Sequence, residues 1–112
     1  MTDESEIPTP FDQRIADGYL GKYILVGLTY VDHDGNQTHR VQLHGVIEKA
    51  APDGITIRLH GARDGQSWNM PPDLRAVSAA EPGIYTLHDT DERVENPDLL
   101  AAWTIHEPPP KH

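Results

Sequence analysis

The strongest constraint on the fold is a pair of consecutive hairpin patterns near the start of the chain. Three runs of alternating apolar residues, 22–32, 38–49 and 55–60, are separated by Asp34-Gly35 and by Asp53-Gly54. Asp-Gly between two such runs is typical of a tight turn, because glycine adopts positive φ angles without steric cost. The pattern therefore predicts three antiparallel strands that follow one another along the chain.

The turns also predict how these strands pair. A two-residue turn at 34–35 pairs residues whose numbers sum to 69, so that Val26 lies opposite Leu43. A second turn with a sum of 106 places Ile47 opposite Leu59. Both registers bring apolar residues together, and a slip by one residue would destroy this agreement.

Gly45 interrupts the second predicted strand, at a position where glycine is typical of a bend or a bulge. A sharply bent second strand lets a short sheet curl into a small barrel. The predicted register also places Glu48 opposite Arg58 on the polar face. We expect that ion pair to contribute little if it is exposed.

A short helix is predicted before the first strand. Thr9 suits the cap position and Pro10 the first helical position, and an acidic residue follows in the first turn. Phe11 and Ile15 then form one short apolar stripe, which predicts a helix over 9–17.

The remaining chain supplies two more predicted strands, 84–88 and 102–106, with a loop and one helical turn at 71–74. We therefore expect an all-β fold: a small, strongly bent antiparallel barrel of about five strands, SH3-like or Sm-like, with a short N-terminal helix. The expected organisation is a disordered acidic lead over 1–8, a single domain over 9–107 and a Pro-rich tail over 108–112.

The composition favours a small acidic protein. With 112 residues, of which 37% are hydrophobic, the chain supports one modest core, and it has no stretch near the roughly 20 apolar residues of a membrane helix. It has no cysteine, which excludes a disulfide framework and a thiolate nucleophile. The polar, acidic start is unlike a secretory signal. We expect a cytoplasmic protein without membrane contact.

The negative charge is concentrated at the two ends. The net charge is −9, and nearly all of the excess lies in residues 1–18 and 88–112, while the central body is close to neutral. Phosphate binding needs a net basic face, so a nucleic-acid partner is not expected. Acidic ends keep a small protein soluble and steer its encounter with a basic partner.

Histidine is the compositional oddity of this chain, which has seven. In the predicted register His44 and His60 are diagonal neighbours on the polar face, about 7–8 Å apart. They are the candidate metal ligands, with His88, His106 or Asp64 as further donors. Because no zinc-binding spacing accompanies them, we interpret them as residues that hydrogen bond locally. Neither a metal nor another cofactor is expected.

Carboxylates cluster at Asp32 and Asp34 and again over 89–95. The first pair resembles part of a calcium loop, but the later bidentate glutamate of such a loop is missing, which favours a polar hairpin tip. The second cluster is interpreted as a solvated charge run. Ser67 and Ser78 lack the context of an activated nucleophile, so no catalytic residue is assigned and a non-enzymatic role is favoured.

A mixed apolar and aromatic face is the candidate partner surface. Aromatic residues beside a sheet are typical of protein interfaces. The alternative interpretation is that the N-terminal helix packs there, or that the tryptophan closes one end of the barrel. The candidate partner-binding residues are Tyr23, Leu25, His44, Val46 and His60 in the strands and Trp68 in a neighbouring loop.

Three segments resemble a family of small uncharacterised bacterial proteins: Gly21 to Tyr30, Pro71 to Leu74, and Pro97 to Leu100 with Trp103-Thr104-Ile105. The resemblance spans most of residues 18–107. It implies a small β-barrel and a bacterial source, and it brings no activity or cofactor. The segment from His44-Gly45 through Ile57 is similar to the bent-strand glycine and hairpin of Sm-like proteins.

These observations favour a non-catalytic protein-binding module that inhibits or neutralises a basic protein partner, as a monomer or a small homo-oligomer. One alternative is a His-based metal-binding protein or hydrolase. A second alternative is a nucleic-acid-binding Sm-like barrel. Its candidate basic stripe comprises Arg40, Arg58, Arg63 and Arg75.

Overall fold

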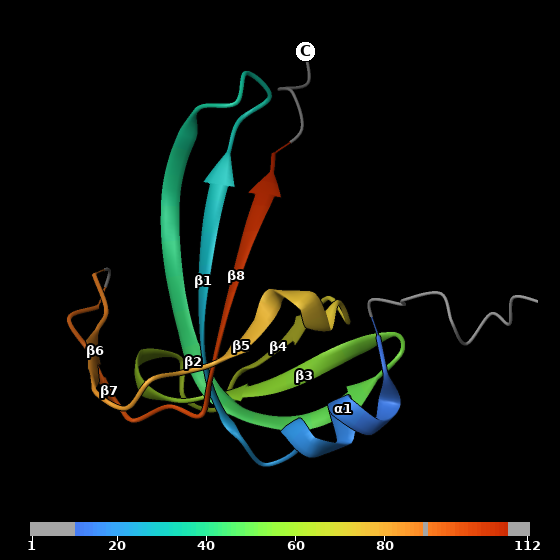
Figure 1. Ribbon diagram of the computed structural model, residues 1–112. Coiled ribbons are helices and arrows are strands. Elements are labelled where there is room, and N and C mark those ends of the chain that lie inside the picture. The colour runs from blue at the N-terminus through green and yellow to red at the C-terminus, as the bar shows by residue number, and fades with distance from the viewer. Residues whose placement is uncertain (1–10, 89, 108–112) are drawn as a thin grey trace, which may run out of the picture.

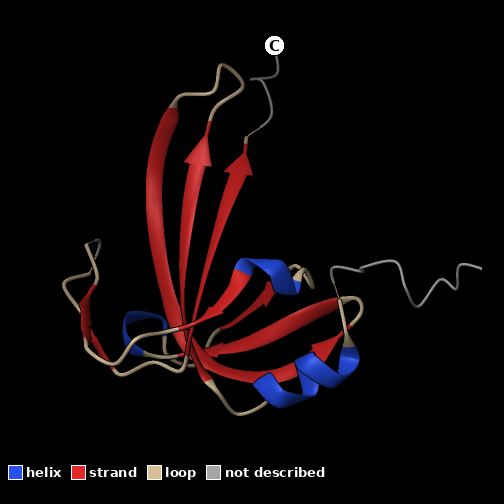
Figure 2. Ribbon diagram, in the orientation of Figure 1, coloured by secondary structure: helices blue, strands red, loops and turns tan. Residues whose placement is uncertain are grey.

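The computed structural model describes residues 11–88 and 90–107, which form a mostly β fold with one short helix. Figures 1 and 2 show one large sheet and a separate small hairpin. The large sheet has the strand order β4-β3-β2-β1-β8-β5. Its strands are β1 (Tyr23–Val31), β2 (Gln37–Ala51), β3 (Gly54–Leu59), β4 (Ser67–Met70), β5 (Val77–Ala79) and β8 (Leu99–His106).

The remaining elements are short. The small hairpin pairs β6 (Ile84–Thr86) with β7 (Arg93–Glu95). One turn of 3-10 helix, η2 (Gly61–Arg63), follows β3, and a second, η3 (Leu74–Ala76), precedes β5. No helix in the described ranges is long and apolar enough to cross a membrane.

The first predicted hairpin is confirmed. β1 and β2 are antiparallel, and Val26 lies opposite Leu43 as predicted. The predicted two-residue turn is corrected, because the register shifts between Tyr30 and Val31 and the Asp32 N–H donates to the backbone oxygen of Asn36. Asp32 stabilises this turn, because its carboxylate accepts the backbone N–H groups of Asp34 and Asn36, both at 2.9 Å. The tip is therefore held by hydrogen bonds within the hairpin itself.

The second hairpin forms, but its predicted register is wrong by two residues up to Ile47 and by one residue after it. Ile47 lies opposite Ile57 rather than Leu59, and the register shifts between Ile47 and Lys49. A shift of two keeps the same side chains on the core face, whereas a shift of one would reverse them. Arg58 therefore lies opposite Val46, and its Nη1 is 4.0 Å from Oε2 of Glu48, an exposed pair of little energetic weight.

The predicted barrel of about five strands is not confirmed, because the large sheet has six strands and is not closed. β8 lies parallel to β1, a long-range pairing that the sequence patterns did not predict. Figure 1 shows β2 curving from an upright part of the sheet into the lower part beside β3. Gly45 lies opposite Leu59 of the neighbouring β3, and a Cβ there would stand 2.0 Å from the backbone oxygen of Arg58.

Three strands extend beyond the rest of the molecule, as the upright part of Figure 1 shows. We call this part the blade and define it as residues 27–31 of β1, 37–42 of β2 and 102–106 of β8. Within it, β1 is central, since it pairs with β2 on one side and with β8 on the other. The main core lies below the blade. Its most deeply buried side chains include Ile24, Val26, Ile47, Ile55, Ile57 and Met70.

The helix begins and ends later than predicted. α1 spans Gln13–Tyr19, and Asp12 caps it by accepting the Arg14 N–H at 2.9 Å. An aspartate at this position satisfies an amide at the helix start, and its extended backbone excludes it from the helix itself. The predicted stripe is also corrected, since Ile15 is 50% exposed while Ala16 is fully buried against the core.

The second half of the chain holds more strand than predicted. Trp68, expected in a loop, lies in β4, where it pairs with Ile57. The helical turn predicted at 71–74 forms later, as η3 over Leu74–Ala76, which Asp73 caps. The predicted strand 102–106 extends back to Leu99, whereas 84–88 shortens to β6. The predicted lead 1–8 and tail 108–112 lie outside the described residues.

Candidate functional site

A buried polar network lies on the face of the sheet opposite the main core, which we call the outer face. The side-chain oxygen of Tyr23 is 2.6 Å from Nδ1 of His44, and Nε2 of His44 is 2.9 Å from Oε1 of Glu92. His44 is the buried polar side chain of the described residues, with 7% of its surface exposed. A buried imidazole is costly unless both nitrogens are paired, and both are paired here.

Three separate parts of the chain position this network. Tyr23 and His44 come from β1 and β2, and their side chains share a face because alternate residues of a strand point the same way. Glu92 comes from the connection between β6 and β7, and it also accepts the Ala62 N–H at 3.0 Å. Gly61 has a φ of +72°, and a Cβ at this residue would overlap the Glu92 carboxylate.

The carboxylate determines the direction of the hydrogen bonds. An ionised Glu92 can only accept, so Nε2 of His44 donates to it. In neutral His44, Nδ1 is then the acceptor and the Tyr23 hydroxyl donates. Hydrogen bonds from Thr90, from His44 and from the Ala62 backbone lower the pKa of Glu92 to about 2, so it is ionised at neutral pH.

A tyrosine, a histidine and a carboxylate in this order have the roles of a nucleophile, a base and a group that orients the base. The surroundings of Tyr23 oppose such chemistry. Burial, and then the negative charge of Glu92, raise the pKa of the tyrosine hydroxyl. A reactive tyrosinate would need the opposite shift, so the arrangement favours a structural hydrogen bond over catalysis.

The network fastens the β6–β7 hairpin to the sheet. Below the hairpin, a second hydrophobic cluster joins Leu25 of β1 to Leu87 and Val94 of the hairpin, all buried. The backbone N–H of His88 donates to Oε1 of Gln42 at 2.7 Å and adds a further polar contact with β2. Apolar packing and charged hydrogen bonds therefore hold the hairpin in one place.

A pocket of about 360 Å³ opens beside the hairpin on the same face. Its centre is a cross-strand row in which Gly27 lies between Gln42 and Ala102. The hydroxyl of Tyr85 donates to the backbone oxygen of Glu81 at 2.8 Å. The pocket is lined by Leu25, Gly27, Gln42, Ala76, Ser78, Tyr85, Leu100, Ala101 and Ala102.

The structure brings together most of the predicted partner-binding residues. His44 and His60 both have their rings near Tyr23, at centroid distances of 5.9 and 5.6 Å. Leu25 lies on the same face but is buried under the hairpin. Val46 is the cross-strand partner of Tyr23 and is partly buried.

Trp68 lies apart from the other predicted residues. It packs against the main core on the opposite face of the sheet, because its partner Ile57 is a core residue. The further metal donors expected beside His44 and His60 were His88, His106 or Asp64. The carboxylate that contacts His44 is instead that of Glu92. Among the described residues, no group of three or more His, Asp or Glu side chains is arranged to hold a metal ion.

Glu92 is the functional residue that sequence reasoning missed. It lies in an acidic run that we interpreted as solvated, yet its side chain is only 20% exposed and contacts a histidine 48 positions earlier. No local signal distinguishes it from the exposed Glu95 nearby. Gly61 lets the Glu92 carboxylate approach, but no pattern in the sequence links this glycine to Glu92.

Comparison of the chain with models of known protein families, with curated proteins and with solved structures finds no match.

Proposed function

We propose that this chain is a non-catalytic protein-binding module that accepts an extended, net-basic segment of a partner protein along the open edge of β8. The main observation in support is that β5 pairs with β8 only over Leu99–Ala101. Beyond Ala101, within the described ranges, no strand lies on the side of β8 away from β1. An unpaired strand edge is a template for addition of a further strand.

The open hydrogen-bonding groups can be assigned by alternation. The Glu107 N–H donates to the oxygen of Val31 in β1, whereas the oxygen of Asp98 accepts the Ala80 N–H on the β5 side. Successive residues of a strand direct their backbone groups to opposite sides. The backbone groups of Ala102, Thr104 and His106 therefore face away from β1. Those of Thr104 and His106 lie beyond η3, which contacts β8, so a partner strand can pair with them.

This edge lacks the features that natural sheets use to block pairing. Residues 102–106 contain no proline, lysine or acidic residue. The free edge of β2 in the blade is different: it carries Arg40, and the backbone oxygen of Gln42 accepts a hydrogen bond from Arg63 at 3.3 Å. Charged side chains and covering contacts are common protections of an edge. β8 is therefore the edge that favours strand addition.

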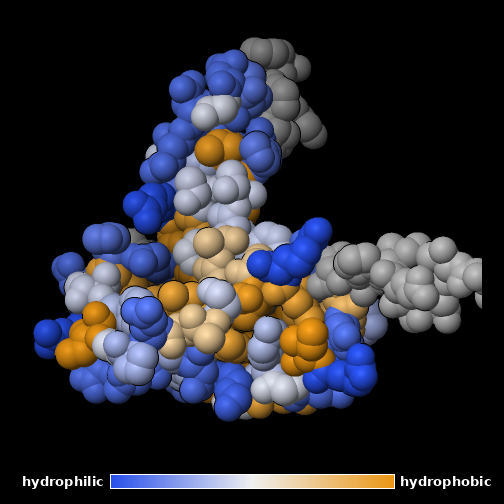
Figure 3. Space-filling model, in the orientation of Figure 1, coloured by the Kyte–Doolittle hydropathy of each residue, from blue (hydrophilic) through white to orange (hydrophobic). Residues whose placement is uncertain are grey.

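The blade offers apolar side chains next to this edge. Leu28 lies between Val41 and Trp103 in one cross-strand row, and Tyr30 lies next to Ile105 in the next. Apart from the buried Leu28, these side chains are partly buried on the core-facing side of the sheet. Figure 3 shows the end of the blade as hydrophilic, with hydrophobic colour gathering where the blade meets the rest of the molecule. Alternate apolar residues of a partner strand could pack in line with these rows.

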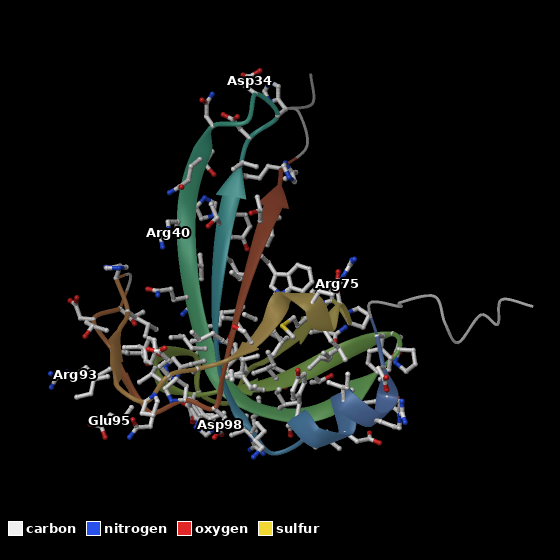
Figure 4. The ribbon with its side chains drawn as sticks, viewed as in Figure 1. Asp34, Arg40, Arg75, Arg93, Glu95 and Asp98 are labelled. Carbon is white, nitrogen blue, oxygen red and sulfur yellow. The ribbon has the colours of Figure 1, made fainter. Side chains whose placement is uncertain are left out.

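Charge selects a basic partner. The chain has a net charge of −9, and Figure 4 places Asp34 at the far end of the blade. Glu107 follows β8 directly, and its carboxylate accepts the hydroxyl of Thr38 at 2.6 Å. These carboxylates lie at the far end of the blade (Figure 4), where they attract lysine and arginine on an incoming segment and raise its rate of encounter.

The proposal is tested by amide hydrogen exchange on the full chain labelled with ¹⁵N. In the free protein, the amides of Thr104 and His106 should exchange faster than those of Trp103 and Ile105, which face β1. The probe is a peptide of about seven residues that alternates lysine with valine. It should slow exchange at Thr104 and His106, and a peptide with glutamate in place of lysine should not.

Two variants make the test specific. Thr104→Pro removes an outward N–H and leaves the β1 ladder intact, so it should weaken peptide binding about tenfold. Ile105→Lys removes no backbone group but places a positive charge beside the edge, and it should also weaken the basic peptide. Slow exchange at 104 and 106 in the free monomer, or peptide protection elsewhere, would overturn the proposal. Protection that depends on protein concentration would assign the edge to a second copy of this chain.

The two alternatives, a His-based metal-binding protein or hydrolase and a nucleic-acid-binding barrel, have less support. A metal ion bound through either ring nitrogen of His44 would have to displace the hydrogen bond that this nitrogen makes. In the candidate basic stripe, Arg75 pairs with Asp73 at 2.7 Å, and Arg58 lies near Glu48. We also propose that the fold is related to SH3-like domains, because β1 to β4 form consecutive hairpins and β2 is curved (Figure 1).

A further inference from the structure

We infer that the outer-face pocket over Gly27 is a binding site for a small, uncharged molecule with a flat aromatic body. This goes beyond the proposed protein-binding function, because the pocket lies on the opposite face of the sheet from the rows of the blade. The inference rests on the glycine itself, on the chemistry of the lining residues and on the size of the cavity.

Gly27 has no conformational reason to be glycine. It lies in the middle of β1, and its φ is outside the left-handed region. A Cβ at this position would meet no atom of the described residues within 4 Å. Glycine in a strand interior loses stability and side-chain packing, and it is typical of a place where a ligand or another backbone approaches closely. The space above Gly27 is the pocket.

The floor of the pocket carries little side-chain bulk. Gly27 lies beside Ala102 in the parallel pairing, so two neighbouring positions of the sheet carry almost no side chain. The wall is partly the ring of Tyr85, whose hydroxyl is already used in a hydrogen bond to Glu81. A flat floor beside an aromatic ring suits an aromatic ligand, which gains from stacking as well as from apolar burial.

The lining also selects against charge. None of the residues that line the pocket is charged, and Leu25 and Leu100 add apolar walls. A charge on the ligand would lose part of its hydration in the pocket and find no charged side chain in the lining to pair with. The hydroxyl of Ser78 supplies a polar group in the lining, so one neutral hydrogen-bonding group on the ligand fits the site. The volume of about 360 Å³ lies in the range of small-molecule sites.

The experiment titrates the full chain with indole, followed by protein NMR and by calorimetry. Indole should bind saturably and shift the amides of Gly27, Ala102 and Tyr85. The matched charged probe, indole-3-acetate, should bind at least about tenfold more weakly. Equal binding of the two probes, or no saturable binding of indole, would overturn the inference.

A pair of variants on one strand locates the site. Gly27→Leu starts from a Cβ that meets no described atom within 4 Å and extends into the pocket, so it should abolish indole binding while the circular dichroism spectrum is kept. Thr29→Leu adds a similar side chain to the same face one row away from the lining residues, and it should leave binding unchanged. Indole binding that survives Gly27→Leu would also overturn the inference. Neither variant changes the outward backbone groups of β8, so the strand-addition test is read independently.

Discussion

Nε2 of His44 lies 2.9 Å from Oε1 of Glu92, and this contact joins the central part of the sheet to the β6–β7 hairpin. Because the same carboxylate oxygen accepts the Ala62 N–H, it connects three segments that are far apart in the chain. A charged acceptor with two donors is worth more than a neutral hydrogen bond. We therefore expect this contact to dominate the stability of the outer face.

Glu92→Gln should destabilise the protein at neutral pH by about 1–3 kcal/mol, the usual effect of losing a hydrogen bond to a charged group. The exposed Glu95→Gln on β7 is the matched control and should change stability by less than about 0.5 kcal/mol. Urea unfolding at pH 7 measures both free energies. Equal effects of the two substitutions would show that the Glu92 contact contributes nothing special.

Acid should weaken the folded state through the same carboxyl. The pKa of Glu92 is about 2 in the folded protein against an ordinary value of 4.5. A lowered folded pKa stabilises the protein above the ordinary value, and this contribution is lost as the pH falls from about 4.5 towards 2. Over this pH window, the free energy of unfolding should fall less steeply for Glu92→Gln than for the unchanged chain. The same slope in both would contradict the assignment.

Gly61→Ala should destabilise the protein more than Gly65→Ala. Both glycines have positive φ, +72° and +87°, so both substitutions incur a backbone cost of about 1–2 kcal/mol. Only at Gly61 would the new methyl group also collide with the Glu92 carboxylate, while at Gly65 it would meet no described atom within 4 Å. Thermal unfolding of the two variants isolates the difference. Equal losses would mean that Glu92 does not approach Gly61.

Gly45→Ala should prevent folding or cost more than about 3 kcal/mol, because its methyl group would overlap the backbone of Arg58. Gly27→Ala in the neighbouring strand is the control. It meets no described atom, and it should be neutral or stabilising by up to about 1 kcal/mol, since alanine loses less chain entropy. Circular dichroism and urea unfolding distinguish the two. A well-folded Gly45→Ala would contradict the close approach of β3.

Trp103→Phe should be tolerated with a change of less than about 1.5 kcal/mol. The indole N–H of Trp103 is buried and has no hydrogen-bond partner among the described residues. An unsatisfied buried donor costs about 1–3 kcal/mol, and its removal offsets the apolar area lost with the larger ring. Urea unfolding measures the balance. A loss above about 3 kcal/mol would show that the indole N–H has a partner in solution.

Local patterns predicted the first hairpin well. The Asp34-Gly35 turn and the alternation of apolar residues on both sides of it depend on neighbours a few positions apart, and a slip by one residue would have exposed the apolar face. The second register was harder, because a bulge after Ile47 shifts the pairing by one residue, so that Ala50 and not Lys49 follows Ile47 into the core.

The sequence patterns could not predict the long-range contacts. Nothing local distinguishes a parallel partner for β1, and Glu92 resembles the exposed carboxylates around it. The helix boundary was misplaced because Thr9 and Asp12 are both suitable caps, and the packing of Ala16 rather than Ile15 depends on where β2 lies.

The sequence by itself determined that the chain is mostly β, that its first strands form consecutive hairpins, and which side chains of β1 and β2 share a face. These properties follow from turn chemistry and from the two-residue period of a strand. Only the tertiary structure decided that β8 lies beside β1 with an open edge, that Glu92 reaches His44, and that a pocket remains above Gly27. Those features arise between segments that are distant in the chain, where packing of the whole sheet, and not local preference, selects the neighbours.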